Sequence, residues 1–461
     1  MTACHLPNPL DTMFLVADQA AGALDLPPIC IHIALHLGGQ VEPGRLRAAL
    51  DALAGRYPPL RGRLTHNPLG RLRWRICRPG EPAGRVPMRV IEVAGPQAAE
   101  QRLQDIYANS EVEPAEAGRP LALYVLRQPA GDVLLARIRH GLMDARGATF
   151  LLEDLDELYA AGADTAPPAS DETDLFDHLI ADVSLRERLR TAARALRRRP
   201  AAPVQQLGAQ RLESARVGRL RYLRQTLDEQ QLQAVQDAAL TRCGFGRFGD
   251  YVRACGLLAA LGALATPGPE TVLSTYNLIN HRKRRRRHPV CRNLTSAVPL
   301  GVPARLADDV VATADALRDQ TLAAMNEQHS RRQFAALAVL MALPAPLLSG
   351  TLRRGWTGQK GASAGLLAPP TLPLGLMGPF SRPMPTFCGQ PLENYYGLAT
   401  ARPLPGFTVD INTTGRAMNI CVGYHDGLVS TGTMQRWLSG FVAALTGTGS
   451  ADQRTARDAG L

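Results

Sequence analysis

The most informative segment of the chain reads RHGLMDARG, from Arg139 to Gly147. Residues 133–138, apolar except for Arg137, are typical of a strand, and residues 148–159 repeat apolar side chains at helical spacing. The segment therefore predicts a junction between a strand and a helix. His140 lies just past the expected strand, and Asp144 lies near the start of the expected helix.

His140 is the candidate catalytic residue of this segment. A histidine with a pKa near neutrality is the usual proton acceptor for an alcohol or amine that attacks a thioester. A strand end holds the backbone rigidly while the side chain faces a crevice. Asp144 could pair with an arginine or orient the imidazole, and Gly147 would let the helix pack close to the sheet. A lone His-x-x-x-Asp also arises by chance, and the histidine is then structural.

Strand and helix patterns alternate on both sides of this segment. The expected strands cover residues 29–37, 72–77, 121–126, 133–138, 221–227, 271–278, 296–300, 408–411 and 419–424. The expected helices cover residues 43–53, 148–159, 175–199, 228–240, 248–265, most of 304–343, and 433–445. The two halves share this rhythm, which predicts an α+β fold with two related domains. We place the domains at 1–170 and 216–461, joined by a charged linker helix at 171–215.

The net charge of +11 on 461 residues favours an anionic partner, such as nucleic acid, a phosphorylated cosubstrate, an acidic protein or an anionic membrane surface. Lys283 and Lys360 are the only lysines, so nearly all of the positive charge is arginine. That usage, with the abundant alanine, is typical of a GC-rich genome and lowers the functional weight of any single arginine.

The cysteines and apolar stretches bear on the cellular setting. The eight cysteines are scattered with no Cys-x-x-Cys pair, which favours reduced thiols in the cytoplasm over disulfides or a zinc site. No secretory signal pattern opens the chain. The longest apolar stretches, near 254–266 and 334–348, fall short of the ~20 residues that a membrane helix needs. We expect no transmembrane segment, and peripheral membrane contact stays open.

Several short motifs occur in a fixed order along nearly the whole chain. They are Asn8–Leu15, Arg56–Leu64, Arg119–Leu121, Arg139–Asp144, Asn280–Arg282, Asn293–Leu300, Gly378–Pro379, Gly389 and Val422–Gly427. Together they resemble the chloramphenicol acetyltransferase-like superfamily, in which the segment at His140 is similar to the His-His-x-x-x-Asp-Gly signature. That superfamily includes condensation domains of peptide synthetases, wax ester synthases/diacylglycerol acyltransferases and polyketide-associated acyltransferases.

The resemblance implies a fold and a set of site residues. The fold would be two related chloramphenicol acetyltransferase-like domains that form a V, with an active-site tunnel between them and His140 midway along it. His140 would be the catalytic base, and Asp144 would be mainly structural, paired with an arginine of the second domain. Arg282 is the candidate partner by its position in the sequence. The donor thioester would enter from one face and the acceptor from the other.

The segment also departs from the family pattern. Arg139 stands where the first, largely structural histidine is expected, and Ala145 stands where the glycine is expected, with Gly147 two residues later. The residues before Gly378-Pro379 lack the Ser-Asn of the wax ester synthases. Stabilisation of an oxyanion would then need another group, such as backbone amides near Gly141 or at the helix start.

We therefore expect a monomeric cytoplasmic acyltransferase that moves an acyl group from a thioester to a hydroxyl or amine acceptor. The thioester would be carried by coenzyme A or by an acyl carrier protein, as a cosubstrate rather than a tightly bound cofactor, and we expect no metal. His140 and Asp144 are the predicted catalytic residues. Arg282, Gly147 and Arg139 are the predicted structural support of the site.

Two other functions remain open from the sequence. The chain could be a catalytically silent condensation-like domain that recruits partners to a carrier-bound intermediate. It could also be a basic nucleic-acid-binding protein, since residues 281–288 form a dense positive run. No aromatic residues interleave with that run, which makes nucleic acid the weaker interpretation. The run also fits a solvated loop, or a docking site for coenzyme A phosphate or an acidic carrier protein.

Overall fold

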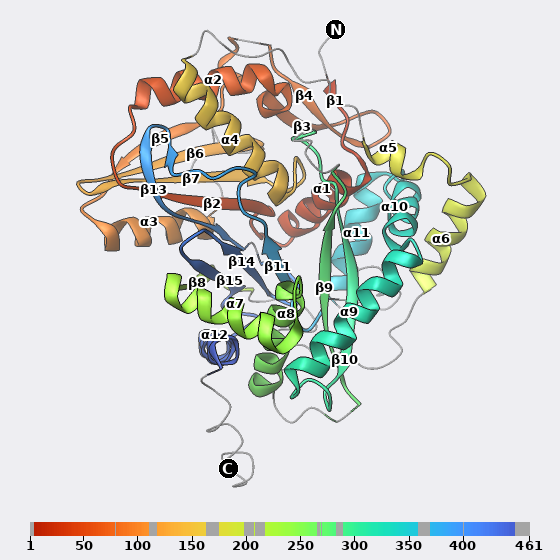
Figure 1. Cartoon of the computed structure of the whole chain (residues 1–461). Coiled ribbons are helices and arrows are strands. Elements are labelled where there is room, and N and C mark those ends of the chain that lie inside the picture. Colours follow the sequence, from red (N-terminus) through yellow and green to blue (C-terminus); the bar gives the residue numbers. More distant parts are fainter. Residues whose placement is uncertain are drawn as a thin grey trace.

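Two lobes with separate sheets make up the computed structural model (Figure 1). It describes residues 4–78, 80–109, 118–162, 175–197, 207, 217–264, 268, 270–282, 289–357, 369–399 and 401–447. Both predicted domain boundaries, at 170/171 and 215/216, lie outside these residues. The positive run is described only at residues 281 and 282.

The first lobe is built on a six-stranded sheet in the order β12-β13-β2-β7-β6-β5. Its strands are β12 (Thr386–Phe387), β13 (Gln390–Leu398), β2 (Cys30–Leu37), β7 (Gly131–Arg139), β6 (Leu121–Gln128) and β5 (Met88–Glu92). Helices α2 (Pro43–Arg56) and α4 (Ala145–Ala161) pack on one face, and α3 (Pro96–Asn109) packs on the other. In β7, Leu134 belongs to the first of these cores and Leu135 to the second. Because both faces are covered, every residue of the strand is buried, including the charged Asp132, Arg137 and Arg139.

The second lobe has a four-stranded sheet in the order β11-β14-β15-β8. Its elements are β8 (Leu220–Leu227), α7 (Glu229–Cys243), α8 (Phe248–Ala263), β11 (Leu374–Met377), β14 (Phe407–Thr413), β15 (Met418–His425) and α12 (Thr431–Thr446). Trp437 of α12 is fully buried and packs in the core with residues of α7, α8 and the sheet. A long hairpin of β9 (Val272–Asn280) and β10 (Thr295–Pro303) lies beside this sheet and packs against α9 (Val310–Asn326) (Figure 1).

The remaining elements lie outside the two main sheets and the long hairpin. They are β1 (Cys4–His5), α1 (Pro9–Gly22), η1 (Pro58–Arg61), β3 (Gly62–His66), β4 (Leu72–Ile76), η2 (Pro82–Gly84), α5 (Leu175–Ile180), α6 (Leu185–Arg197), α10 (His329–Leu340) and α11 (Ala345–Trp356). Strands β1, β4 and β3 form a small antiparallel sheet. Among the described residues no single helix has the length and hydropathy to cross a bilayer; α10 and α11 pass that test only as a pair, bent by 116°.

Strand β13 links the two lobes. It follows β11 of the second lobe in the sequence but pairs antiparallel with β2 of the first, with Tyr395 opposite Leu35 and Tyr396 opposite Ala34. The chain then returns to the second lobe as β14. A segment from the predicted second domain therefore adds to the sheet of the first.

The predicted helix over residues 175–199 is wrong as a single helix. Two helices, α5 and α6, occupy the described part of that range. Ser184 separates them, because its hydroxyl accepts a hydrogen bond from the Glu187 amide at 3.3 Å and its carbonyl accepts one from Arg188 at 3.0 Å. A serine whose hydroxyl accepts a hydrogen bond from the backbone amide three residues later is typical of the N-cap of a new helix.

Candidate active site

His140 lies directly after β7, at the contact between the lobes. Its backbone amide donates to the Ile29 carbonyl at 2.9 Å, which continues the pairing of β7 with the segment before β2. Its half-buried imidazole stacks on the ring of Phe14 in α1, with centroids 3.6 Å apart and planes 13° apart. The strand end and α1 therefore hold the imidazole in one orientation.

Asn293 contacts one ring nitrogen of His140. The distance between His140 Nδ1 and Asn293 Oδ1 is 3.1 Å. The amide of Asn293 is oriented by two acceptors, because its Nδ2 donates to Asp11 Oδ1 at 2.8 Å and to the His140 carbonyl at 2.7 Å. An amide oxygen can only accept, so His140 Nδ1 carries the proton and Nε2 keeps its lone pair. That tautomer presents Nε2 as a base.

Asp11 supports Asn293 from the first turn of α1. Its side chain accepts from the Asn293 amide at 2.8 Å, and it completes a capping box with Asn8. Asn8 in turn donates to the Asn293 carbonyl at 3.0 Å. Burial raises the pKa of Asp11 to about 7, although the charge of Arg292 and the hydrogen bonds from Asn293 act in the opposite direction. The start of α1 in the first lobe thus fixes the segment before β10.

Asp144 is the N-cap of α4 and connects that helix to the second lobe. One oxygen accepts from the Gly147 amide at 2.9 Å, and the other accepts from the Leu294 amide at 2.8 Å and the Thr295 hydroxyl at 3.0 Å. Arg282 Nη1 lies 2.8 Å from Oδ1 and 2.9 Å from Oδ2. Burial alone would raise the pKa of Asp144, but the Arg282 charge and these donors outweigh it and hold the pKa below its usual value.

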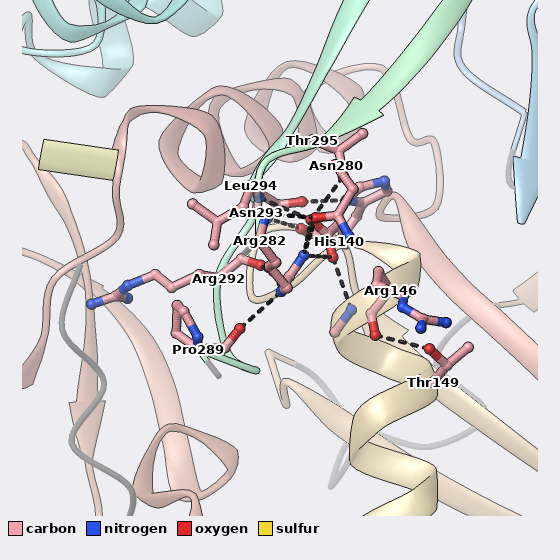
Figure 2. Close-up of polar contacts among 12 residues, drawn as sticks. His140, Arg146, Thr149, Asn280, Arg282, Pro289, Arg292, Asn293, Leu294 and Thr295 are labelled. Carbon is pink, nitrogen blue, oxygen red and sulfur yellow. Dashed lines mark hydrogen bonds and ion pairs between the residues drawn. The ribbon is translucent and has the colours of Figure 1, made fainter. Parts of the chain in front are cut away.

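Arg282 is fully engaged by the segment around it. Besides Asp144, its guanidinium donates to the carbonyls of Pro289 at 3.0 Å and Arg292 at 2.8 Å, and to Asn280 Oδ1 at 3.3 Å. Figure 2 shows these groups gathered between the start of α4 and the segment from Pro289 to Thr295, while the Arg292 side chain extends away from them. The structure therefore brings together Asp144 and Arg282, the pairing that the resemblance implied.

Gly147 packs differently from the prediction. A methyl group at Gly147 would lie 2.4 Å from the Val290 carbonyl oxygen and 3.1 Å from the Met143 Cβ. The expected close approach to the sheet is therefore wrong, since the nearest backbone is the second-lobe segment before β10. The glycine allows α4 to meet the other lobe, beside Arg282.

Arg139, in the place of the first signature histidine, forms an ion pair with Asp18 of α1 at 3.4 Å. Asp18 also accepts from the Ile29 amide at 2.7 Å. Both side chains are buried. This pair ties α1 to the end of β7, one residue before His140, so Arg139 supports the position of the imidazole without contacting it.

The electrostatic surroundings keep His140 neutral. Burial lowers its pKa to about 4, and the positive charge of Arg402 acts in the same direction; its own carbonyl, Asp144 and Asn293 act against that lowering. Arg402 lies near the site: its guanidinium carbon is 5.6 Å from the centroid of the Phe14 ring. At neutral pH the imidazole is therefore uncharged and able to accept a proton.

Two backbone amides near His140 already have acceptors. The Leu142 amide donates to the Arg139 carbonyl at 2.9 Å, and the Gly147 amide donates to Asp144. Neither is therefore free to hold an oxyanion, although both lie in the region where the sequence suggested a donor. In the part of the chain that the structure describes, no group of three or more His, Cys, Asp or Glu could hold a metal ion.

The sequence placed Asp11 and Asn293 inside family-like motifs but assigned neither a role. Asn293 reaches His140 across 153 positions, and Asp11 reaches Asn293 across 282. One local signal was available, because Asn8-Pro9 followed by Asp11 is the pattern of a capped helix start. Nothing local indicates that the cap also holds a partner of His140.

No known family model and no curated protein sequence matches the chain. Solved structures do match over almost its full length. The first condensation domain of the calcium-dependent antibiotic synthetase, in complex with a substrate analogue, is 16% identical with a TM-score of 0.67, over 96% of this chain and 97% of that one. Trichothecene 15-O-acetyltransferase from Fusarium sporotrichioides is 13% identical with a TM-score of 0.67, over 96% and 94%.

A third match is the starter condensation domain of rhizomide synthetase in complex with C8-CoA. It is 18% identical with a TM-score of 0.64, over 96% of this chain and 95% of that chain. The chain has the two-lobed fold that these condensation domains share with the acetyltransferase. The α+β architecture and the superfamily fold predicted from the ordered motifs are thereby confirmed.

Proposed function

We propose that this protein is an acyltransferase in which His140 is the general base. The observation that carries the proposal is the contact between His140 Nδ1 and Asn293 Oδ1 at 3.1 Å. It fixes the tautomer that presents a bare Nε2, while burial keeps the ring neutral. The transferases and condensation domains that share the fold support acyl transfer as the reaction class.

In the proposed reaction, His140 Nε2 takes the proton from the hydroxyl or amine of the acceptor as that group attacks the thioester carbonyl. The new bond to carbon gives a tetrahedral intermediate. When it collapses, the carbon–sulfur bond breaks and the proton passes from the imidazolium to the leaving thiolate. The reaction balances without a redox partner, and His140 ends neutral.

The donor of the proposed reaction is an acyl thioester on coenzyme A or on an acyl carrier protein, bound as a cosubstrate. The rhizomide synthetase starter domain, which shares the fold, binds C8-CoA. The proposal keeps the enzyme as a cytoplasmic monomer that meets its donor and acceptor in solution, as expected from the sequence.

The proposal is tested with the purified full chain, a panel of acyl thioesters and a panel of alcohols and amines, with products identified by mass spectrometry. General-base catalysis contributes about 10²- to 10⁴-fold, so His140→Ala should reduce transfer by at least about 100-fold. The exposed His178 in α5 provides the matched control, and His178→Ala should leave turnover unchanged. Near-parental turnover by folded His140→Ala would refute the role of His140.

The same assay separates the silent recruiting domain from the enzyme. If the chain only recruits partners, it will retain a carrier protein in a pull-down but consume no thioester with any acceptor. Asp144 and Arg282 favour neither outcome, because their ion pair supports the fold in both cases. The decisive readout is therefore thioester consumption that depends on His140.

A further inference from the structure

Arg402 lies in the loop between β13 and β14 and faces the same aromatic ring as the candidate base. Its guanidinium carbon is 5.6 Å from the Phe14 centroid, and the His140 imidazole is stacked on the same ring with centroids 3.6 Å apart. The distance from the guanidinium carbon to the centre of the imidazole ring therefore cannot exceed the sum of these two distances. Arg402 is also exposed, so a ligand in solution can reach it.

Arg402 forms no ion pair with a carboxylate of the described residues. Within the residues that the structure describes, its contact is the Phe14 ring, and no ion pair within 4.0 Å is present. The charge of Arg402 acts on Asp410 of β14. Burial raises the pKa of Asp410 to about 6, while the positive charge of Arg402 acts to lower it. Arg402 is therefore a cation whose guanidinium can donate hydrogen bonds to a ligand. It contacts the Phe14 ring, on which the candidate base His140 is stacked.

The buried carboxylate of Asp410 lies against glycines of the neighbouring strands. A methyl group at Gly375 would lie 2.7 Å from Asp410 Oδ1, and one at Gly397 would lie 3.7 Å from Oδ2. Two glycines on the neighbouring strands β11 and β13 thus leave the space that this carboxylate fills. An anion that approached the site would meet Asp410 as a like charge and Arg402 as the opposite charge, so binding depends on Arg402.

We propose that Arg402 binds a carboxylate of the acceptor, and that the acceptor is a small hydroxy acid or amino acid. This inference rests on the proposed function, because it places the acceptor nucleophile at His140 Nε2. The acceptor would be small, because the guanidinium and the imidazole contact the same Phe14 ring and their separation is limited by it. The phosphates of coenzyme A do not fit this place, since the long pantetheine arm separates them from the thioester. A guanidinium binds a carboxylate through two parallel hydrogen bonds.

The test measures binding of matched probes to the full chain by ligand-observed NMR, without a donor. Each probe pair has one acid and its methyl ester: L-lactate with methyl L-lactate for the hydroxy acids, and L-alanine with L-alanine methyl ester for the amino acids. For at least one pair the parent chain should bind the acid at least about fivefold more tightly, as a charge-assisted hydrogen bond at a partly exposed site allows. Arg402→Gln should remove that preference, and Arg402→Lys should restore part of it.

The control variant is Arg416→Gln, which removes an exposed arginine from the β14–β15 turn and should keep the preference. If the parent shows no preference for the acid in either pair, or if folded Arg402→Gln keeps it, the inference is overturned. His140→Ala separates this result from the proposed function. Loss of turnover with no loss of acid preference supports both ideas, whereas acid preference in a chain without any transferase activity overturns only the proposed reaction.

Discussion

The hydrogen bond between His140 and Asn293 determines which ring nitrogen can accept a proton, so Asn293 is the residue to change. Asn293→Ala leaves His140 in place but removes the acceptor at Nδ1. We expect kcat to fall roughly tenfold to a hundredfold with a smaller change in KM, because the imidazole samples the wrong tautomer. Steady-state kinetics on the folded variant measure this effect.

The control for Asn293 is Asn67→Ala. Asn67 is also an asparagine that accepts backbone hydrogen bonds, from Leu69 and Arg71 at 2.9 Å, but it lies in the β3–β4 turn. Its replacement should leave kcat unchanged. Equal kcat values for the parent and Asn293→Ala would show that Asn293 does not orient the base.

The pH dependence of the reaction should reflect the burial of His140. Because burial lowers its pKa to about 4, the imidazole stays neutral and active at pH values where an ordinary histidine is already protonated. The acid limb of log kcat/KM against pH should fall near pH 4, not near 6.5, with folding checked by circular dichroism at each pH. Arg402→Gln should move the limb to higher pH, because the positive charge of Arg402 lowers the pKa of His140. An acid limb near 6.5 in the parent would contradict the assigned environment.

At the level of single residues, the sequence predicted those groups whose motif is contiguous. His140 and Asp144 lie four positions apart, and their types indicate proton transfer and helix capping. The partner Arg282 came from the family resemblance alone, because 138 positions separate it from Asp144. Arg402 lies in no motif, and only its place above Phe14 gives it significance.

At the level of elements, helix α4 and the segment before β10 meet so closely that Gly147 tolerates no side chain. Gly147→Ala would place Cβ 2.4 Å from the Val290 carbonyl oxygen. Because that oxygen belongs to the backbone, the main chain itself would have to shift to relieve the clash. We expect a loss of about 1–3 kcal/mol in the free energy of unfolding, as for other overpacked sites. Chemical denaturation followed by circular dichroism measures it.

The matched control for Gly147 is Gly262→Ala in α8, where a new Cβ meets nothing within 4 Å. That change should be neutral or stabilising by about 0.5–1 kcal/mol, because alanine restricts the unfolded chain. A Gly147→Ala chain as stable as Gly262→Ala would mean that the lobes can separate at this contact without cost.

Most elements of the two main sheets were predictable because their apolar spacing is local. The strand β7 and helix α4 were recognised from residues 133–138 and 148–159, and extend only a few residues beyond those bounds. Strand β13 was missed, since its exposed and buried residues follow no simple period and its partner β2 lies more than 300 positions away. Pairing over such a separation leaves no mark in a short window of sequence.

At the level of the whole molecule, the two lobes should unfold together. Strand β13 pairs with β2 across the lobes, and the ion pair of Asp144 with Arg282 and the hydrogen bonds of Asn293 join them again at the site. Breaking the lobe contact would expose the buried Asp144–Arg282 pair and an edge of the first sheet. A chain with only one lobe folded is therefore much less stable than the fully folded chain. We therefore expect one cooperative transition, although a chain of 461 residues often shows more.

Tryptophan reporters test this expectation in each lobe. Trp74 is buried in β4 of the first lobe and Trp437 in α12 of the second. With Trp356 and one of these two replaced by phenylalanine, each chain has one tryptophan. Within each single-tryptophan chain, the fluorescence transition in urea should coincide with the transition by far-UV circular dichroism. Comparison within one chain is needed because each replacement changes stability by itself. If fluorescence from Trp74 or Trp437 changes at a separate urea concentration, the lobes unfold independently, and the contacts at His140 do not couple them.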